Sequence, residues 1–142
     1  MSKLELKPYE RRSNYYETDQ MGIVHHTNYF RYFEEARLDL MRQAGCSARE
    51  LEKLGIIIPN VDAYAKYLRL LHFEDEFTVV VKPVQFTGVR MKFEYEVVKD
   101  GEIYCTGYTT HCFVGTDMKP LIIKRTHPEV YERIARVFDN LA

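Results

Sequence analysis

The amino-acid sequence predicts an α+β fold in which an antiparallel sheet wraps around one long central helix. Two observations carry this prediction: a long stretch of helical periodicity in the first third of the chain, and a run of strand-like segments after it. The simplest packing buries the helix under a meander of these strands. The 142 residues have the length of one domain, and no repeat or Pro/Gly/Ser-rich linker divides residues 1–142.

The first elements are a strand and the central helix. Residues 8–17 are aromatic and polar, which is compatible with a strand. Residues 28–44 form the clearest helix, because apolar positions recur along them every three or four residues: Tyr29, Phe33, Ala36, Leu40 and Ala44. Thr27 or Asn28 is expected to cap the start of this helix, and Gly45 to end it in the left-handed conformation.

A second, short helix and four strands are expected next. Ser47 and Glu50 have the spacing of a capping box, which opens the short helix. Residues 90–98 alternate between apolar and charged side chains, so one face of that strand is covered and the other is wet. Asp100-Gly101 is a hairpin signal. The expected strands cover residues 56–72, 77–86, 90–98 and 102–114, and a tail helix covers residues 127–140.

Charge and composition exclude several classes of function. Twenty Lys and Arg residues oppose 21 Asp and Glu residues, so the formal net charge is −1 and no basic excess favours nucleic acid or an anionic membrane. We find no secretory signal and no apolar run long enough to span a bilayer. The three cysteines form no Cys-x-x-Cys pair, so we expect free thiols in a reducing cytoplasm.

The stretch from residue 15 to residue 29 holds the densest group of chemically active side chains. Asp19 is expected in a loop, Gly22 in a turn, and the chain then enters the N-terminus of the central helix. Amides in the first turn of a helix have no intrahelical partner, and they can polarise a carbonyl oxygen. A carboxylate opposite them can attack the carbonyl carbon or deprotonate a water. From spacing alone, an aspartate in this position is more often a turn or capping residue than a catalytic one.

This stretch resembles the signature of the hotdog-fold acyl-CoA thioesterases, in particular the 4-hydroxybenzoyl-CoA thioesterase and YbgC-like group. A weaker second block around residues 67–75 is similar too, although the family pattern has Pro where this chain has Leu70 and Gly where it has Glu74. The resemblance covers about residues 10–115. The residues that match the first block are Tyr15, Asp19, Gly22, Ile23, Val24, His26, Asn28, Tyr29, Phe33, Glu34 and Arg37.

The resemblance implies an acyl-CoA thioesterase in which Asp19 is the nucleophile or general base. It implies that the backbone amide near His26 binds the thioester oxygen, and that the His26 and Tyr15 side chains belong to the catalytic site. The candidate substrate-binding positions are Gly22, Val24, Asn28, Arg90 and Lys92, the last two as cations for the CoA phosphates. Solvated surface charge is an equal explanation for those two cations.

The expected partners are an acyl-CoA substrate and further copies of the same chain, as a homodimer or homotetramer. Acyl carrier protein is an alternative carrier of the acyl group, and we expect no metal and no cofactor, since CoA is part of the substrate. The adjacent His25 and His26 lack the spacing of metal ligands. We expect Glu35 to pair with Arg31, four residues before it.

Two other functions remain open from the sequence. One is a hotdog-fold hydratase or dehydratase that acts on enoyl thioesters, and the other is a binding module for acyl-CoA or acyl carrier protein without turnover. The sequence lacks the Asp and His pattern of the hydratase relatives. It leaves undecided which acyl group is bound and whether Asp19 acts as nucleophile or base.

Overall fold

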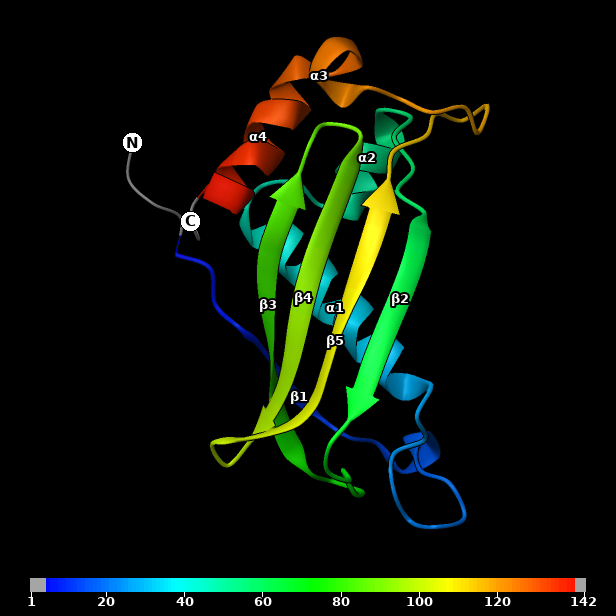
Figure 1. The fold of residues 1–142 in the computed structure, drawn as a ribbon, viewed down its shortest axis with the longest axis vertical. Helices are drawn as coiled ribbons and strands as arrows, with labels where there is room; N and C mark the ends of the chain where they lie inside the picture. Colours follow the sequence, from blue (N-terminus) through cyan, green and yellow to red (C-terminus); the bar gives the residue numbers. More distant parts are fainter. Residues whose placement is uncertain (1–4, 140–142) are drawn as a thin grey trace.

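The computed structural model describes residues 5–139. Its centre is a five-stranded antiparallel sheet with the strand order β1-β3-β4-β5-β2, and helix α1 lies across one face of it (Figure 1). This arrangement confirms the α+β prediction. The strands are β1 (Tyr9–Arg12), β2 (Asn60–Tyr67), β3 (Glu76–Phe86), β4 (Arg90–Lys99) and β5 (Glu102–Cys112), and the central helix is α1 (Asn28–Gln43).

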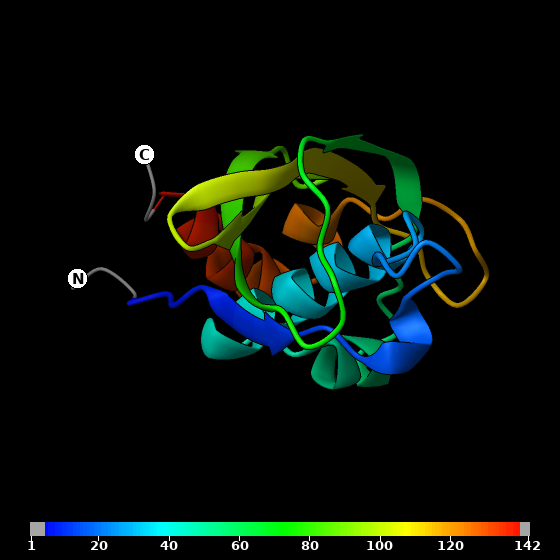
Figure 2. The same cartoon turned by 90° about the horizontal axis from the view of Figure 1, so that it is seen from below.

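The sheet curves around α1, and the core lies between them (Figure 2). The alternation expected in β4 is present, with four side chains buried against the helix: Met91, Phe93, Tyr95 and Val97. Phe33 of α1 stacks on Tyr95, with ring centroids 4.4 Å apart. A Cβ atom on Gly107 of β5 would lie only 2.6 Å from the Phe33 ring. Glycine at this position therefore lets the helix approach the strand.

Two predicted strands are shorter in the structure than the sequence indicated. The first, expected over 8–17, ends at Arg12, and Tyr15–Glu17 form a 3-10 turn, η1, because the Glu17 side chain turns back to accept the Asn14 amide. The strand expected over 56–72 is confined to β2. Pro59, just before β2, has no amide to donate to a ladder, and Ile56 is buried in the core instead.

The ends of α1 confirm one of the two expected caps. Thr27 is the N-cap residue but makes no side-chain bond to the helix, and the Asn28 side chain donates to the Glu17 carbonyl at 2.9 Å instead. The expected cap from Thr27 or Asn28 is therefore wrong. Gly45 has a φ of +79°, which confirms its left-handed position after the helix. The Ser47 hydroxyl accepts the Glu50 amide and opens α2 (Ala48–Lys53), as predicted.

The tail of the chain packs beside α1 on the same face of the sheet. Helix α4 (Pro128–Asp139) confirms the predicted tail helix, whose expected last residue lies outside the described residues. A short helix before it, α3 (Ile123–Thr126), was not predicted. Phe138 of α4 stacks on Phe86, with ring centroids 5.4 Å apart. None of the helices within residues 5–139 has the length and apolar character of a membrane span.

Candidate functional site

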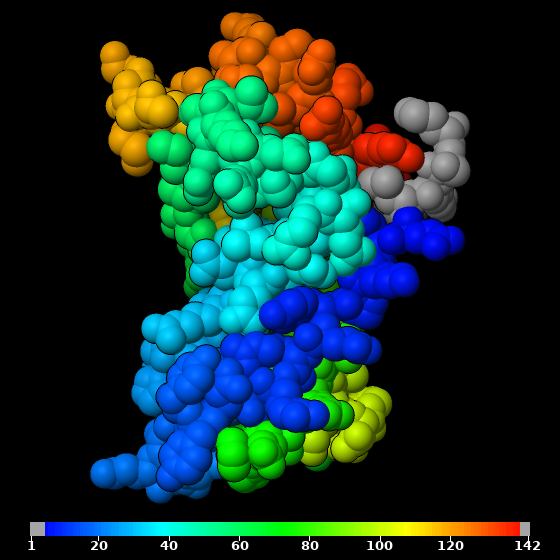
Figure 3. Space-filling view, turned by 180° about the vertical axis from the view of Figure 1, so that it is seen from behind, coloured from blue at the N-terminus to red at the C-terminus, as the bar shows by residue number. Residues whose placement is uncertain are grey.

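Asp19 lies in a closed hairpin that precedes α1. Thr18 and Val24 form an isolated bridge, and the Asp19 amide donates to the Ile23 carbonyl at 2.9 Å. The Gly22 amide donates to the Asp19 carbonyl at 3.0 Å, and Gly22 has a φ of +75°, a conformation that costs residues with a Cβ. The hairpin lies at the opposite end of the molecule from α2 and α3 (Figures 1 and 3).

The Asp19 carboxylate has one oxygen held and one open. Oδ1 accepts the Met21 amide at 2.8 Å, which orients the side chain across the turn. Within residues 5–139, Oδ2 has no hydrogen-bond partner and no cation forms an ion pair with the carboxylate. The side chain is partly exposed. Asp19 therefore offers a positioned oxygen that can attack a carbon atom or accept a proton.

The His26 backbone N–H is the second chemically important group of this site. The amides around it are occupied, since His25 donates to the Glu17 carbonyl, Asn28 to the His25 carbonyl and Tyr29 to the His26 carbonyl. Among the described residues, the His26 N–H has no partner. It stands just before the N-terminus of α1, where the helix dipole favours negative charge. This amide is suited to polarise a carbonyl oxygen, the role that the resemblance implied for this position.

Tyr67, at the end of β2, holds the His26 peptide in place. Its hydroxyl donates to the His26 carbonyl at 3.2 Å, and its ring lies edge-on to Tyr29 with centroids 5.2 Å apart. The residues of this contact are 41 positions apart in the chain. Tyr67 was not among the predicted site residues, although it begins the second block of the resemblance.

Beneath the hairpin, Glu17 forms a buried ion pair that was also not predicted. Glu17 is 3% exposed, and its carboxylate accepts two hydrogen bonds from Arg11, at 2.9 and 2.7 Å, and one from Tyr32 at 2.9 Å. Burial raises the pKa of Glu17, but these donors and the Asn14 amide outweigh burial and lower the pKa below its ordinary value. Glu17 therefore stays ionised and joins β1, η1 and α1.

Arg11 extends the same network to Glu35 on α1. The Arg11 Nε donates to Glu35 at 2.9 Å, and the Tyr9 hydroxyl donates to the same oxygen at 3.0 Å. The expected pair between Glu35 and Arg31 is therefore wrong, because Glu35 faces β1. Two carboxylates raise the pKa of Arg11 above its ordinary value, although burial lowers it.

The other predicted catalytic side chain, Tyr15, lies at the surface. It is 75% exposed, and its ring packs against Phe73 with centroids 5.3 Å apart. The His26 ring is also exposed and lies 4.3 Å from the ring of His25, centroid to centroid. No group of three His, Cys, Asp or Glu side chains within residues 5–139 converges as metal ligands would.

Three predicted substrate-binding positions have structural contacts here. Val24 is 3% exposed, and its amide donates to the Leu71 carbonyl at 2.8 Å. Asn28 is 5% exposed and bonds the Glu17 carbonyl. Gly22 shapes the Asp19 turn. These hydrogen bonds and the Gly22 turn position the hairpin against the helix. That the three residues contact a substrate stays a prediction.

Arg90 and Lys92 lie at the far end of the sheet from the Asp19 hairpin of the same chain. Arg90 begins β4, next to the turn after β3 at the top of Figure 1. Lys92 Nζ sits 4.5 Å from the centre of the Tyr108 ring, on the sheet face away from α1. The structure therefore does not bring these cations to Asp19 within one chain.

Comparisons with known proteins agree with this architecture. A family model described as the thioesterase-like superfamily matches residues 14–136. The 1,4-dihydroxy-2-naphthoyl-CoA hydrolase of Thermosynechococcus vestitus is 28% identical over 102 residues, which cover 71% of this chain and 70% of that protein. The family match spans the Asp19 hairpin, α1 and strands β2 to β5.

Solved structures show the same fold. The DHNA-CoA thioesterase from Staphylococcus aureus superposes with a TM-score of 0.87 at 32% identity, covering 92% of this chain and 89% of that one. A hypothetical protein from Aquifex aeolicus superposes with a TM-score of 0.82 at 35% identity, covering 88% of this chain and 98% of that one. This chain therefore belongs to the thioesterase-like superfamily, has the hotdog fold, and is a thioester hydrolase.

Proposed function

We propose that this protein hydrolyses an acyl-CoA thioester to the free acid and CoA. The observation that carries the proposal is that the hairpin and the helix entry after it hold two groups without a partner among the described residues: the Asp19 Oδ2 and the His26 N–H. A thioester needs both a nucleophile or base at its carbon and a donor at its oxygen. The names of the 1,4-dihydroxy-2-naphthoyl-CoA hydrolase and the DHNA-CoA thioesterase support a CoA thioester as the substrate class.

The proposed reaction begins when the thioester oxygen accepts the His26 N–H. In one route, Asp19 attacks the carbonyl carbon, the C–S bond breaks and CoA leaves as a thiolate; a water then hydrolyses the acyl-aspartyl anhydride, and its two protons go to the acid and to the thiolate, which leaves Asp19 ionised again. In the other route, Asp19 takes a proton from a water whose oxygen attacks the carbon, the C–S bond breaks, and the CoA thiolate takes that proton from Asp19. Each route consumes one water and gives the acid and CoA. Tyr15 and the His26 ring orient substrate or water, and neither route uses a metal or a cofactor.

We propose that residues 1–142 act as one hotdog domain that pairs with a second copy through β2. This strand is an edge of the sheet, and it exposes three large apolar side chains: Val61, Tyr64 and Tyr67. Unpaired edges with apolar side chains are sites of strand pairing. Antiparallel pairing about a two-fold axis brings the end of the partner's sheet that carries Arg90 toward the Asp19 hairpin. In that arrangement, Arg90 and Lys92 of the second copy would lie near the Asp19 hairpin of the first and could bind the CoA phosphates.

The compartment we propose is the cytoplasm, where the free thiols Cys46, Cys105 and Cys112 stay reduced. Acyl carrier protein is an alternative carrier of the acyl group, with the same thioester presented to Asp19.

The test is the release of free CoA by the purified protein, measured with a thiol-detecting reagent over a panel of aryl and aliphatic acyl-CoAs. We expect at least one substrate to release CoA. No release from any substrate would contradict the proposal. Conversion of enoyl-CoA to its hydrated product without CoA release would favour a hydratase, and binding without turnover would favour a binding module.

A further inference from the structure

The Asp19 hairpin and the entry to α1 meet at one main-chain carbonyl, that of Glu17. Its oxygen accepts two hydrogen bonds, from the His25 amide at 2.8 Å and from the Asn28 Nδ2 at 2.9 Å. A carbonyl oxygen has two lone pairs, so both are in use. Glu17 lies two residues before Asp19, and His25 lies directly before His26. This carbonyl therefore joins the two segments that carry the groups of the proposed reaction.

Asn28 bonds both of these segments. Its side chain donates to the Glu17 carbonyl, and its main-chain amide donates to the His25 carbonyl at 2.9 Å. Within residues 5–139, no other residue hydrogen-bonds both Glu17 and His25. The Asn28 side chain is buried, so loss of its donor leaves the Glu17 carbonyl without an easy replacement from water. Asn28 is thus the cross-link between the two segments.

The other end of this cross-link does not depend on Asn28. The buried Glu17 side chain accepts hydrogen bonds from Arg11, Tyr32 and the Asn14 amide. Glu17 therefore stays in place when the bond from Asn28 is removed. The movement that such a removal allows falls on the peptides between Glu17 and α1, which include those of Asp19 and His26.

The orientation of the Asn28 side chain is defined by its partner. A main-chain carbonyl can only accept, so the atom that faces Glu17 is the amide nitrogen, and Oδ1 points elsewhere. Among the described residues, Oδ1 has no hydrogen-bond partner. An acceptor of this kind is what the predicted substrate contact of Asn28 would use. The two roles therefore involve different atoms of one side chain, which makes them separable.

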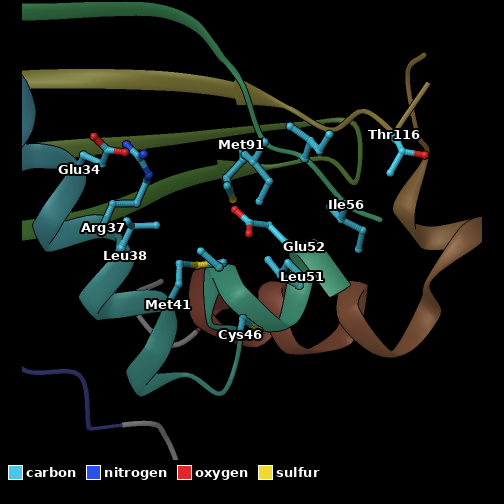
Figure 4. Close-up of a pocket in the computed structure, with 13 residues that line it drawn as sticks. Glu34, Arg37, Leu38, Met41, Cys46, Leu51, Glu52, Ile56, Met91 and Thr116 are labelled. Atoms are coloured by element: carbon cyan, nitrogen blue, oxygen red, sulfur yellow. The ribbon is translucent and has the colours of Figure 1, made fainter. Parts of the chain in front are cut away.

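Asn28 is not a wall of the apolar cavity beside α1. This cavity has a volume of about 520 Å³, and its lining includes neither Asn28 nor a residue of the hairpin. Figure 4 shows it farther along the helix, with Glu34 and Arg37 at one end and Thr116 at the other. The contacts that explain a buried asparagine at the start of α1 are therefore those to Glu17 and His25.

We propose, building on the thioesterase function proposed above, that Asn28 is a positioning residue that holds the His26 N–H and the Asp19 carboxylate in register. Without the Nδ2 bond, the peptide before His26 loses its cross-link to Glu17, and its N–H no longer points in one fixed direction. A displacement of about 1 Å at a reacting group can lower the rate about 100-fold. Asn28 acts through Asp19 and His26 and touches no reacting atom.

The test measures kcat and KM of Asn28→Ala on the acyl-CoA that the wild type hydrolyses fastest. We expect kcat to fall about 10- to 100-fold and KM to stay close to the wild-type value. A substrate contact through Oδ1 predicts the converse, a raised KM with kcat kept. Asn28→Asp keeps the shape and an acceptor oxygen but has no donor for Glu17 at neutral pH, so its kcat should fall too.

The matched control is Gln43→Ala. Gln43 is also a carboxamide on α1 whose nitrogen bonds a main-chain carbonyl, that of Lys7 at 3.0 Å, but it lies at the opposite end of the helix. We expect its kcat and KM to equal those of the wild type. Circular dichroism and urea unfolding confirm that each variant is folded. A wild-type kcat in folded Asn28→Ala or Asn28→Asp would overturn the positioning role, while CoA release by the wild type still supports the thioesterase.

Amide hydrogen exchange, followed by NMR, gives a readout that needs no turnover. The His25 amide shares the Glu17 carbonyl with Asn28, so in Asn28→Ala it should exchange about fivefold faster, the effect of one lost hydrogen bond. The amides of β4 should exchange as in the wild type. Unchanged exchange of the His25 amide would contradict the cross-link even if no thioester were hydrolysed.

Discussion

Replacement of Glu17 by Gln removes the charge that joins β1, η1 and α1 beneath the Asp19 hairpin. The wild-type carboxylate accepts four hydrogen bonds, from Arg11 twice, from the Asn14 amide and from Tyr32. Gln keeps the shape of the side chain, but its amide group turns one acceptor into a donor that faces Arg11. The substitution therefore tests the ion pair with little change in packing.

The structure sets the size of the expected effect. Removing one partner of a buried ion pair costs about 3–5 kcal/mol when the remaining charge has no other partner. Here Arg11 keeps Glu35 and is 15% exposed, so we expect a cost below that range, about 2–3 kcal/mol of unfolding free energy. The matched control is Glu76→Gln, which breaks the surface pair with Arg12 and should leave the stability close to that of the wild type.

The effect also depends on pH in a defined direction. The pKa of Glu17 is lowered in the folded protein, so its contribution is complete above its ordinary pKa of 4.5 and is lost as the pH falls through the lowered value. Urea unfolding at neutral and acidic pH measures both the loss of unfolding free energy and its dependence on pH. We expect the difference between wild type and Glu17→Gln to be constant near neutrality and to shrink in acid. Equal stability of the two proteins at pH 7 would refute the reasoning.

Three further predictions concern the site and the core. Tyr67→Phe removes the hydrogen bond to the His26 carbonyl, worth about 1 kcal/mol, so kcat should fall about fivefold with KM little changed; an unchanged kcat would show that this contact does not position the amide. The pKa of His111 is about 3 in the folded protein against an ordinary 6.5, so only the unfolded chain takes up a proton between these values. The folded protein therefore loses stability as the pH decreases from 6.5 toward 3. From pH 6.5 to 5 this costs roughly 2 kcal/mol, measurable by denaturation, and His111→Leu should lack that slope. Gly107→Ala places a methyl group 2.6 Å from the Phe33 ring and closer still to the Tyr64 carbonyl oxygen of β2, so thermal unfolding should show a loss of about 1–3 kcal/mol; a neutral effect would mean that both neighbours can move away there.

Local patterns predicted the elements whose side chains repeat regularly. The helical period of α1 and the alternation of β4 gave the two layers of the core, and Gly45 and Ser47 marked the ends of helices. The Asp19 turn was also predictable, since Gly22 and the helix start lie within a few residues of Asp19. Free amides at the start of the helix were expected from the same local order, and the resemblance pointed to the one near His26, two residues before α1 begins.

Long-range contacts were beyond these patterns. Tyr67 bonds His26 from 41 residues away in the chain. Glu35 pairs with Arg11, 24 residues away, and not with the nearby Arg31. Glu74 has a φ of +64°, a conformation that favours the glycine of the family pattern, and the sequence alone gives no reason for a Glu there. The placement of Arg90 and Lys92 at the far end of the sheet depends on the direction in which β3 and β4 run relative to α1, which spacing does not determine.

The most direct test of the proposed mechanism is CoA release by Asp19→Asn, measured beside the wild type on the same acyl-CoA. Asn keeps the oxygen that accepts the Met21 amide, so the hairpin is preserved while the ionised oxygen is lost. We predict a fall in kcat on the order of 10²–10⁴, with unchanged unfolding stability. Wild-type rates of CoA release from a folded Asp19→Asn protein would contradict the assignment of Asp19 as nucleophile or base.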